Sequence, residues 1–171
     1  MNRADALRPV DDAARAQATA LLAAARHGAL AALEPGSGHP LASRVALVAE
    51  ADGALIILIS TLAAHTGALQ ADPRCSVLIG EPGAGDPLAH PRLSLAGRAR
   101  MLERDSAKGQ AARERYLQAH PKAALYADFG DFAFWRIEPL RASLNAGFGR
   151  AHEFSAEDLR PIRAADGPTR P

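Results

Sequence analysis

The sequence has a single cysteine and few aromatic residues, and what it lacks narrows the classes of protein it can encode. Cys75 alone cannot form an intrachain disulfide or a cysteine-rich metal site. No apolar stretch is long enough to span a bilayer, and residues 1–13 lack the apolar core of a signal peptide. The 20 basic and 19 acidic residues nearly cancel, so no general attraction for nucleic acid or an anionic membrane arises. We therefore expect a soluble cytoplasmic protein that binds neither.

Several signatures of catalysis are also missing. The six histidines show no paired metal-ligand spacing. No Gly-x-Ser-x-Gly motif is present, and no Gly-x-Gly-x-x-Gly follows a strand to open a helix. No pair of carboxylates can be singled out for acid–base chemistry. The sequence thus predicts no metal site and leaves the catalytic residues unknown.

Strand-like segments dominate the pattern of apolar residues. The region 29–80 is β-rich, with one short helix inserted, and further strands are predicted after residue 92. Six or seven strands, two main helices and antiparallel hairpins predict a mainly β protein, a small barrel with peripheral helices. The predicted helices are 11–26 and 105–119, the later strands are 92–103, 132–139 and 141–146, a helical turn is predicted at 154–159, and residues 163–171 are predicted to be a disordered tail.

One stretch near the middle of the chain combines a buried strand with polar groups. The apolar run from Ile56 ends in Ser60 and Thr61, and a short helix from Leu62 to Ala71 is predicted to follow. A hydroxyl before a helix commonly accepts a hydrogen bond from a first-turn N–H. The unpaired N–H groups and the helix dipole also favour an anion at this end.

A hairpin before this stretch supplies a cation. Asp52-Gly53 between two apolar runs predicts a two-residue turn, which pairs Ala51 with Ala54 and places Arg44 opposite Thr61. A guanidinium, hydroxyls and a helix N-terminus together suit a phosphate monoester. The alternative is structural, because capping hydroxyls and cross-strand Arg–Thr pairs are common. His65 likewise either points into this site as a donor or is an ordinary surface histidine.

Short motifs in a definite order resemble a known family. The segments 43–47, 59–66, 72–78 and 134–139 resemble the split-barrel flavoproteins related to pyridoxamine 5′-phosphate oxidase. Asp86-Pro87-Leu88-Ala89-His90-Pro91 and the segment 126–132 are similar to the haem-utilisation (HugZ-type) branch of that family. The resemblance covers about residues 14–152.

This resemblance implies a six-stranded antiparallel split β-barrel of the FMN-binding type and a homodimer with FMN bound between the subunits. It implies a split-barrel domain at 14–152, an N-terminal arm at 1–13 and a C-terminal tail at 153–171. By motif position, Arg44 would hold the FMN phosphate, and Ser60 and Thr61 would add hydrogen-bond donors to it. His65 and Thr66 would occupy the place of the family's basic phosphate-binding pair. The residues that would lie along the flavin ring are Val45, Ala46 and Ile59.

The sequence also departs from the oxidases. Ala64 and His65 stand where the oxidases carry an Arg-Lys pair, and Asn145 lies near the place of a tryptophan over the flavin, so we do not expect vitamin B6 oxidation. The leading hypothesis is an FMN-binding flavoprotein. Its expected activity is that of an FMN-dependent oxidoreductase acting on an unknown small-molecule substrate. The alternatives are a haem-binding or haem-utilisation protein, with propionates on arginine side chains, and an FMN-binding module without turnover.

Overall fold

Eight strands form one sheet that closes on itself. The computed structural model describes residues 7–147 and 150–159. The strand order is β1-β8-β7-β4-β3-β2-β5-β6, and β6 also pairs with β7, so six strands, β2 to β7, close into a barrel. All neighbours within the barrel are antiparallel, which confirms the predicted split-barrel fold. The strands are β1 Leu7–Arg8, β2 His27–Leu33, β3 Pro40–Ala49, β4 Leu55–Ser60, β5 Arg74–Ile79, β6 Arg92–Met101, β7 Phe132–Asn145 and β8 Ala151–Ser155.

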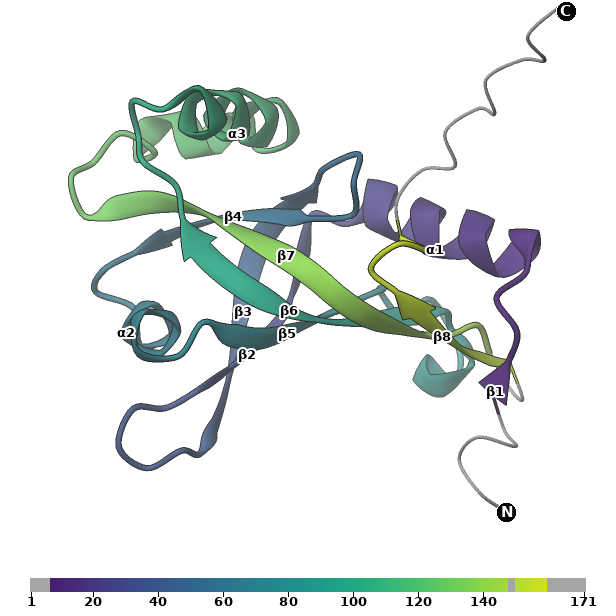
Figure 1. Ribbon diagram of the computed structural model, residues 1–171. Helices are drawn as coiled ribbons and strands as arrows, with labels where there is room; N and C mark the ends of the chain where they lie inside the picture. Colours follow the sequence, from purple (N-terminus) through teal and green to yellow (C-terminus); the bar gives the residue numbers. More distant parts are fainter. Residues whose placement is uncertain (1–6, 148–149, 160–171) are drawn as a thin grey trace, which may run out of the picture.

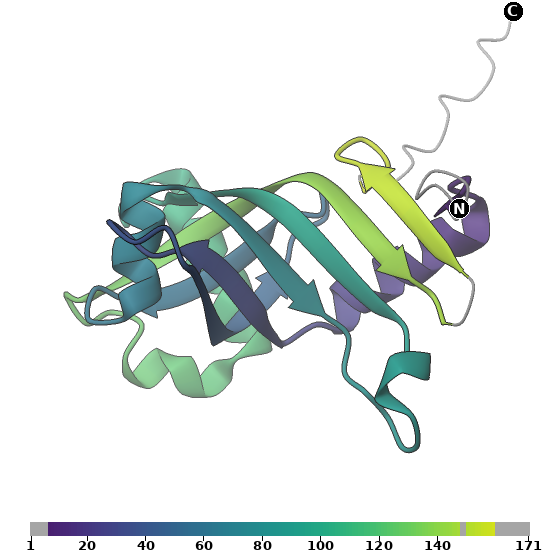
Figure 2. The ribbon, with the colours of Figure 1, turned by 90° about the horizontal axis from the view of Figure 1, so that it is seen from below.

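Three α-helices surround the barrel. They are α1 Asp12–Ala24, α2 Ala64–Ala71 and α3 Ala107–Ala119, with short 3-10 helices η2 Pro87–Ala89 and η3 Pro121–Leu125. The two ribbon views place α1 and α2 at opposite ends of the barrel, while α3 crosses its outer side (Figures 1 and 2). None of the helices in the described part of the chain has the length and hydropathy needed to cross a membrane.

Two apolar cores explain why β4 reads as a continuous apolar run. Residues Leu55–Ile59 are all buried, since alternate side chains enter different cores. Ile57 and Ile59 belong to the core inside the barrel. Ile56 and Leu58 belong to a second core, between the outer side of the barrel and α3, where Tyr116 of α3 is packed. The helix α3 therefore covers part of the outer side of β3, β4 and β7, and a hollow lies on either side of the covered part.

The β3–β4 hairpin differs from the predicted two-residue turn. Its loop has three residues, Ala51 to Gly53: Glu50 N donates to Ala54 O (2.7 Å), and Gly53 N donates to Glu50 O (3.1 Å). Gly53 has φ +82°, the left-handed conformation that completes this kind of three-residue loop. Leu47 pairs with Ile57, so the register aligns Arg44 with Ser60 and the predicted Arg44–Thr61 pairing is wrong.

Helix boundaries also differ from the sequence-based expectation in two places. The first helix ends at Ala24 rather than near residue 26, because the chain enters β2 at His27 and pairs there with β3. The helix α2 begins at Ala64, after Ala63 as N-cap residue, and no side chain caps it. The predicted hydroxyl cap at Ser60 or Thr61 is therefore wrong.

The C-terminal part contains more strand than was predicted. The segments 132–139 and 141–146 form one strand, β7, because its pairing with β6 continues through a register shift at Ala96/Gly97. The predicted helical turn begins only after β8, which lies in residues 151–155 and pairs with β7 and, in parallel, with β1. The boundary expected between residues 152 and 153 thus falls inside a strand. The predicted disordered tail, 163–171, lies outside the described residues.

Candidate functional site

A hollow lies at the end of the α3-covered surface that is nearest α2. It has a volume of about 390 Å³. Its walls come from β3, β4, the start of α2, α3 and the segment that leads into β7. The lining residues are Arg44, Val45, Ala46, Leu58, Ile59, Ser60, Ala63, His65, Tyr116, Tyr126 and Phe132.

The structure brings together six of the eight residues predicted for the cofactor site. Arg44, Ala46, Ser60 and His65 line the hollow, as do Val45 and Ile59. The side chains of Val45 and Ile59 belong to the barrel core, so these two residues offer mainly their backbone. Thr61 and Thr66 are not among the lining residues. Thr66 is buried, and its hydroxyl donates to Ser60 O (2.6 Å), so it stabilises the turn before α2.

The Ser60 hydroxyl already has partners within the protein. Ser60 Oγ donates to Asp131 Oδ2 (2.6 Å) and accepts from Leu62 N (3.1 Å). Asp131 O also accepts from Thr61 N (2.8 Å), which joins the loop after β4 to the loop before β7. Consequently a carboxylate lies beside the hydroxyl that the sequence assigns to phosphate binding.

Charge on the remaining polar groups is limited. Arg44 is exposed, and no hydrogen bond or ion pair of its side chain is found within the described residues. Burial lowers the pKa of His65, so its imidazole is neutral at physiological pH. Burial raises the pKa of Tyr116, and the nearby Tyr126 raises it further, so the phenol of Tyr116 stays uncharged. The pocket therefore offers one guanidinium and one neutral imidazole.

Aromatic residues of this site were not found from the sequence. Tyr116 comes from α3, Tyr126 from the end of η3, and Phe132 from the start of β7; Tyr126 and Phe132 are packed with ring centroids 5.0 Å apart. The segment 126–132 was noted for its family resemblance, but nothing in its spacing assigns its side chains to the Arg44 pocket. Within the described residues, no group of three or more His, Cys, Asp or Glu side chains could hold a metal ion.

The geometry suits a flat, largely apolar ligand with an anionic edge. Aliphatic and aromatic side chains supply contact area, and Arg44 supplies a fork of donors for a carboxylate or phosphate. Residues 14–146 match the family model described as pyridoxamine 5′-phosphate oxidase. The chain belongs to this family. This confirms the resemblance drawn from the motifs, and the relatives described next place the chain in the haem-utilisation branch of the family.

Two relatives of this chain are named as haem oxygenases. The chain is 41% identical over 133 residues to the chloroplastic non-canonical heme oxygenase HOZ of Arabidopsis thaliana, covering 74% of this chain and 39% of that protein. It is 30% identical over 134 residues to the heme oxygenase HutZ of Vibrio cholerae, covering 71% of this chain and 70% of that protein. The chain thus spans well under half of the plant protein's length.

A solved structure shares the fold over most of the chain. A heme binding protein from Mycobacterium smegmatis superposes with a TM-score of 0.79 and is 34% identical. The match covers 88% of this chain and 61% of that chain.

Proposed function

We propose that this protein binds haem in the Arg44 pocket and takes part in haem utilisation. The observation that carries the proposal is the hydrogen bond from Ser60 to the Asp131 carboxylate (2.6 Å). In this bond the Ser60 hydroxyl, which was expected to bind phosphate, donates its proton to Asp131, and the carboxylate places a negative charge beside the hydroxyl. What remains is one guanidinium next to apolar and aromatic walls, which matches haem better than a doubly charged phosphate.

The side chains present fit haem in three respects. Leu58, Ala46 and the aromatic rings would contact the macrocycle, and Arg44 would pair with a propionate. The imidazole of His65, neutral because burial lowers its pKa, would be available to the iron. Bound haem would supply an iron centre that reacts with dioxygen, the chemistry that haem degradation needs. Degradation itself is proposed from the similarity to HOZ and HutZ.

A second copy of the chain would complete this site. Leu62 (88% exposed) and Phe129 (57%) lie in loops, and Leu125 (79%) ends η3; all three are close in sequence to residues that line the pocket, and they present apolar surface to solvent. Exposed apolar patches beside an open pocket favour burial in an interface. We therefore propose that haem lies between two subunits, in the position where the family resemblance implies FMN.

FMN remains the second candidate ligand because the family fold and Arg44 both favour it. The neutral His65 and the Asp131 carboxylate weigh against tight binding of the FMN phosphate. A flavin-dependent oxidoreductase would require that FMN survives desalting and is reduced by NADH or NADPH. A non-catalytic FMN-binding module would retain the flavin but fail to reduce it.

The deciding experiment is a titration of the purified protein with haem and, separately, with FMN. Binding is monitored by the absorption spectrum. We expect a Soret band that saturates at a fixed haem-to-chain ratio, and flavin bands that disappear on desalting. Arg44→Ala should weaken haem binding by about 1.5–3 kcal/mol, the contribution of a charge-assisted hydrogen bond.

Haem dimethyl ester, which has no carboxylates, provides the control for Arg44. Its affinity should be the same for the wild type and for Arg44→Ala. Tight FMN binding together with no Soret band would refute the proposal and restore the flavoprotein hypothesis.

Light scattering tests the subunit arrangement. The chain has a mass of 17.9 kDa, so the homodimer predicts a particle of twice that mass. Leu125→Ser should shift the particle toward the monomer and weaken haem binding at the same time. A dimer that Leu125→Ser leaves intact would place the subunit contact elsewhere.

A further inference from the structure

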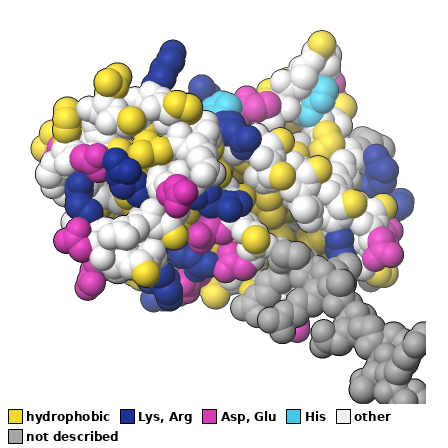
Figure 3. All heavy atoms as spheres, turned by 90° about the horizontal axis from the view of Figure 1, so that it is seen from above, with side chains coloured by type: hydrophobic (Ala, Val, Ile, Leu, Met, Phe, Trp, Pro, Cys, Tyr) yellow, Lys and Arg dark blue, Asp and Glu magenta, His cyan; other side chains and the backbone are white. Residues whose placement is uncertain are grey.

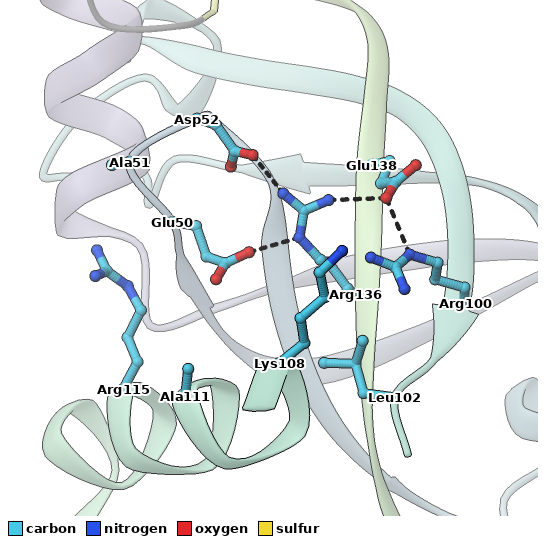
Figure 4. Close-up of a pocket in the computed structure, with 10 residues that line it drawn as sticks. All are labelled: Glu50, Ala51, Asp52, Arg100, Leu102, Lys108, Ala111, Arg115, Arg136 and Glu138. Atoms are coloured by element: carbon cyan, nitrogen blue, oxygen red, sulfur yellow. Dashed lines mark hydrogen bonds and ion pairs between the residues drawn. The ribbon is translucent and has the colours of Figure 1, made fainter. Parts of the chain in front are cut away.

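A second hollow, of about 540 Å³, lies at the opposite end of the α3-covered surface. It shares none of its lining residues with the Arg44 pocket. Glu50 and Asp52 of the β3–β4 hairpin form one side, Arg100, Arg136 and Glu138 of β6 and β7 form the floor, and Lys108, Ala111 and Arg115 of α3 form the other side (Figure 4).

The carboxylates of this hollow are all paired, and most of their ion pairs are with one arginine. All three carboxylates contact Arg136: Glu50 at 2.7 Å, Glu138 at 3.0 Å, and Asp52 as well. Glu138 is shared with Arg100 Nε (2.9 Å). The carboxylates therefore neutralise the central guanidinium and part of a second one.

Arg100 is held through its Nε, and its two terminal nitrogens have no partner among the described residues. Arg100 and Arg136 are directly opposed across β6 and β7, an arrangement that is unfavourable for like charges unless a counter-ion is present. Glu138 supplies that counter-ion through Arg100 Nε. The terminal nitrogens of Arg100 make no hydrogen bond with the described residues, and Figure 4 shows them pointing into the hollow.

Lys108 adds a second unpaired cation to the same space. Its side chain has no ion pair or hydrogen bond among the described residues, and it extends from α3 toward Arg136 (Figure 4). Ala111, one turn further along α3, is small and leaves room beside it. Arg115 donates through Nε to Ala49 O (2.8 Å) and contributes a further positive charge. With Arg136 included, four cations face three carboxylates.

We propose that this hollow is a binding site for a small phosphate-type anion, held between Lys108 and the terminal nitrogens of Arg100. A guanidinium fork matches two oxygens of such an anion, and the lysine ammonium neutralises further charge. The ionic surroundings exclude an apolar ligand. Basic and acidic side chains are interspersed over the face that bears α3 (Figure 3), so the anion would be recognised by this local pair and not by a broad positive field.

The sequence contains two lysines, Lys108 and Lys122, which allows an internally controlled test. Both are exposed, and Lys122, on η3, lies outside the hollow. The full chain is acetylated in the presence and absence of pyrophosphate, and the modification of each lysine is measured by mass spectrometry. We expect pyrophosphate to slow acetylation of Lys108 at least fivefold. The acetylation rate of Lys122 should stay within twofold of its rate without pyrophosphate.

Binding measured by calorimetry gives a second readout. Lys108→Ala should weaken pyrophosphate binding at least fivefold, whereas Lys122→Ala should not change it; neither side chain makes a contact whose loss would unfold the protein. Equal protection of both lysines, or of neither, would overturn the proposal and leave the cluster as a structural ion network. Equal protection of Lys108 by succinate would overturn the assignment to phosphate-type anions. Because haem is absent from this experiment, its result does not depend on the proposed haem site.

Discussion

Ser60 Oγ donates a hydrogen bond of 2.6 Å to Asp131 Oδ2, which ties the end of β4 to the loop before β7. The backbone repeats this connection, since Thr61 N donates to Asp131 O. The pairing fixes the shape of the pocket beside Arg44. It also determines the pocket's electrostatics, because a carboxylate lies where a phosphate-binding site would need donors.

Asp131→Asn should strengthen FMN binding. The substitution removes one negative charge near the expected position of the phosphate and keeps an oxygen that can accept the Ser60 proton. For two charges near a protein surface the gain is about 1 kcal/mol or more, which corresponds to about fivefold or more in affinity. Fluorescence titration with FMN measures it.

Riboflavin, which lacks the phosphate, is the control for this charge effect. Its affinity should be equal in the wild type and in Asp131→Asn. If FMN and riboflavin gain equally, the substitution acts through the shape of the loop and not through its charge.

The barrel and most of its strands could be predicted from the sequence, whereas the alignment of β3 with β4 could not. The Asp52-Gly53 dipeptide correctly marks the turn, but it is compatible with loops of two or three residues. The loop of three shifts the alignment by one residue and brings Arg44 opposite Ser60. Both residues stay on the α3 side of the barrel, so the predicted neighbourhood of Arg44 and Ser60 is confirmed although the predicted partner, Thr61, is wrong.

The aromatic wall of the pocket shows what local patterns cannot reveal. Tyr116 is buried in the core under α3 and also reaches the pocket. From the sequence, the position of Tyr116 in a helix predicts only that it belongs to the apolar face of that helix. That this face is placed over β4, with Tyr126 and Phe132 beside it, is decided by packing between segments distant in the sequence.

Gly53→Ala should destabilise the protein by about 1–2 kcal/mol, since a non-glycine residue is strained at positive φ. Gly53 has φ +82°, and a Cβ there would lie 3.1 Å from Leu159 O. Gly67→Ala is the matched control, because Gly67 lies inside α2 with no atom within 4 Å of the added Cβ. That change should stabilise the protein by about 0.5–1 kcal/mol through helix propensity. Urea unfolding measures both, and the same sign for the two variants would contradict the assigned hairpin geometry.

Arg136→Ala should destabilise the protein by about 2 kcal/mol, because it leaves the carboxylates of Glu50 and Asp52 without their counter-ion. The Arg136 side chain is 16% exposed and contacts Glu50, Asp52 and Glu138, so it joins the β3–β4 hairpin to β7. Arg74→Ala is the comparison, since the Arg74–Asp72 pair is exposed and local; its melting temperature should match that of the wild type. Equal losses for the two variants would show that the Arg136 cluster is no stronger than a surface pair.

Stability should fall with acidification through a window set by His65. Burial lowers the pKa of His65 in the folded state below its ordinary value of 6.5. Between that lowered pKa and 6.5 the unfolded chain binds more protons than the folded chain, so the free energy of unfolding decreases as the pH falls through this window. About one pH unit above 6.5 the imidazole is almost fully neutral in both states and contributes no slope.

Comparison with His65→Gln isolates this contribution, because the other histidines titrate equally in both proteins. Urea unfolding of each is followed from pH 5 to about pH 8.5. The wild type should lose stability relative to the variant as the pH falls from about 7.5, and the difference should stay constant at higher pH. Parallel curves over the whole range would mean that His65 is as well solvated in the folded chain as in the unfolded one, which would remove the reason to expect a neutral imidazole in the pocket at acidic pH.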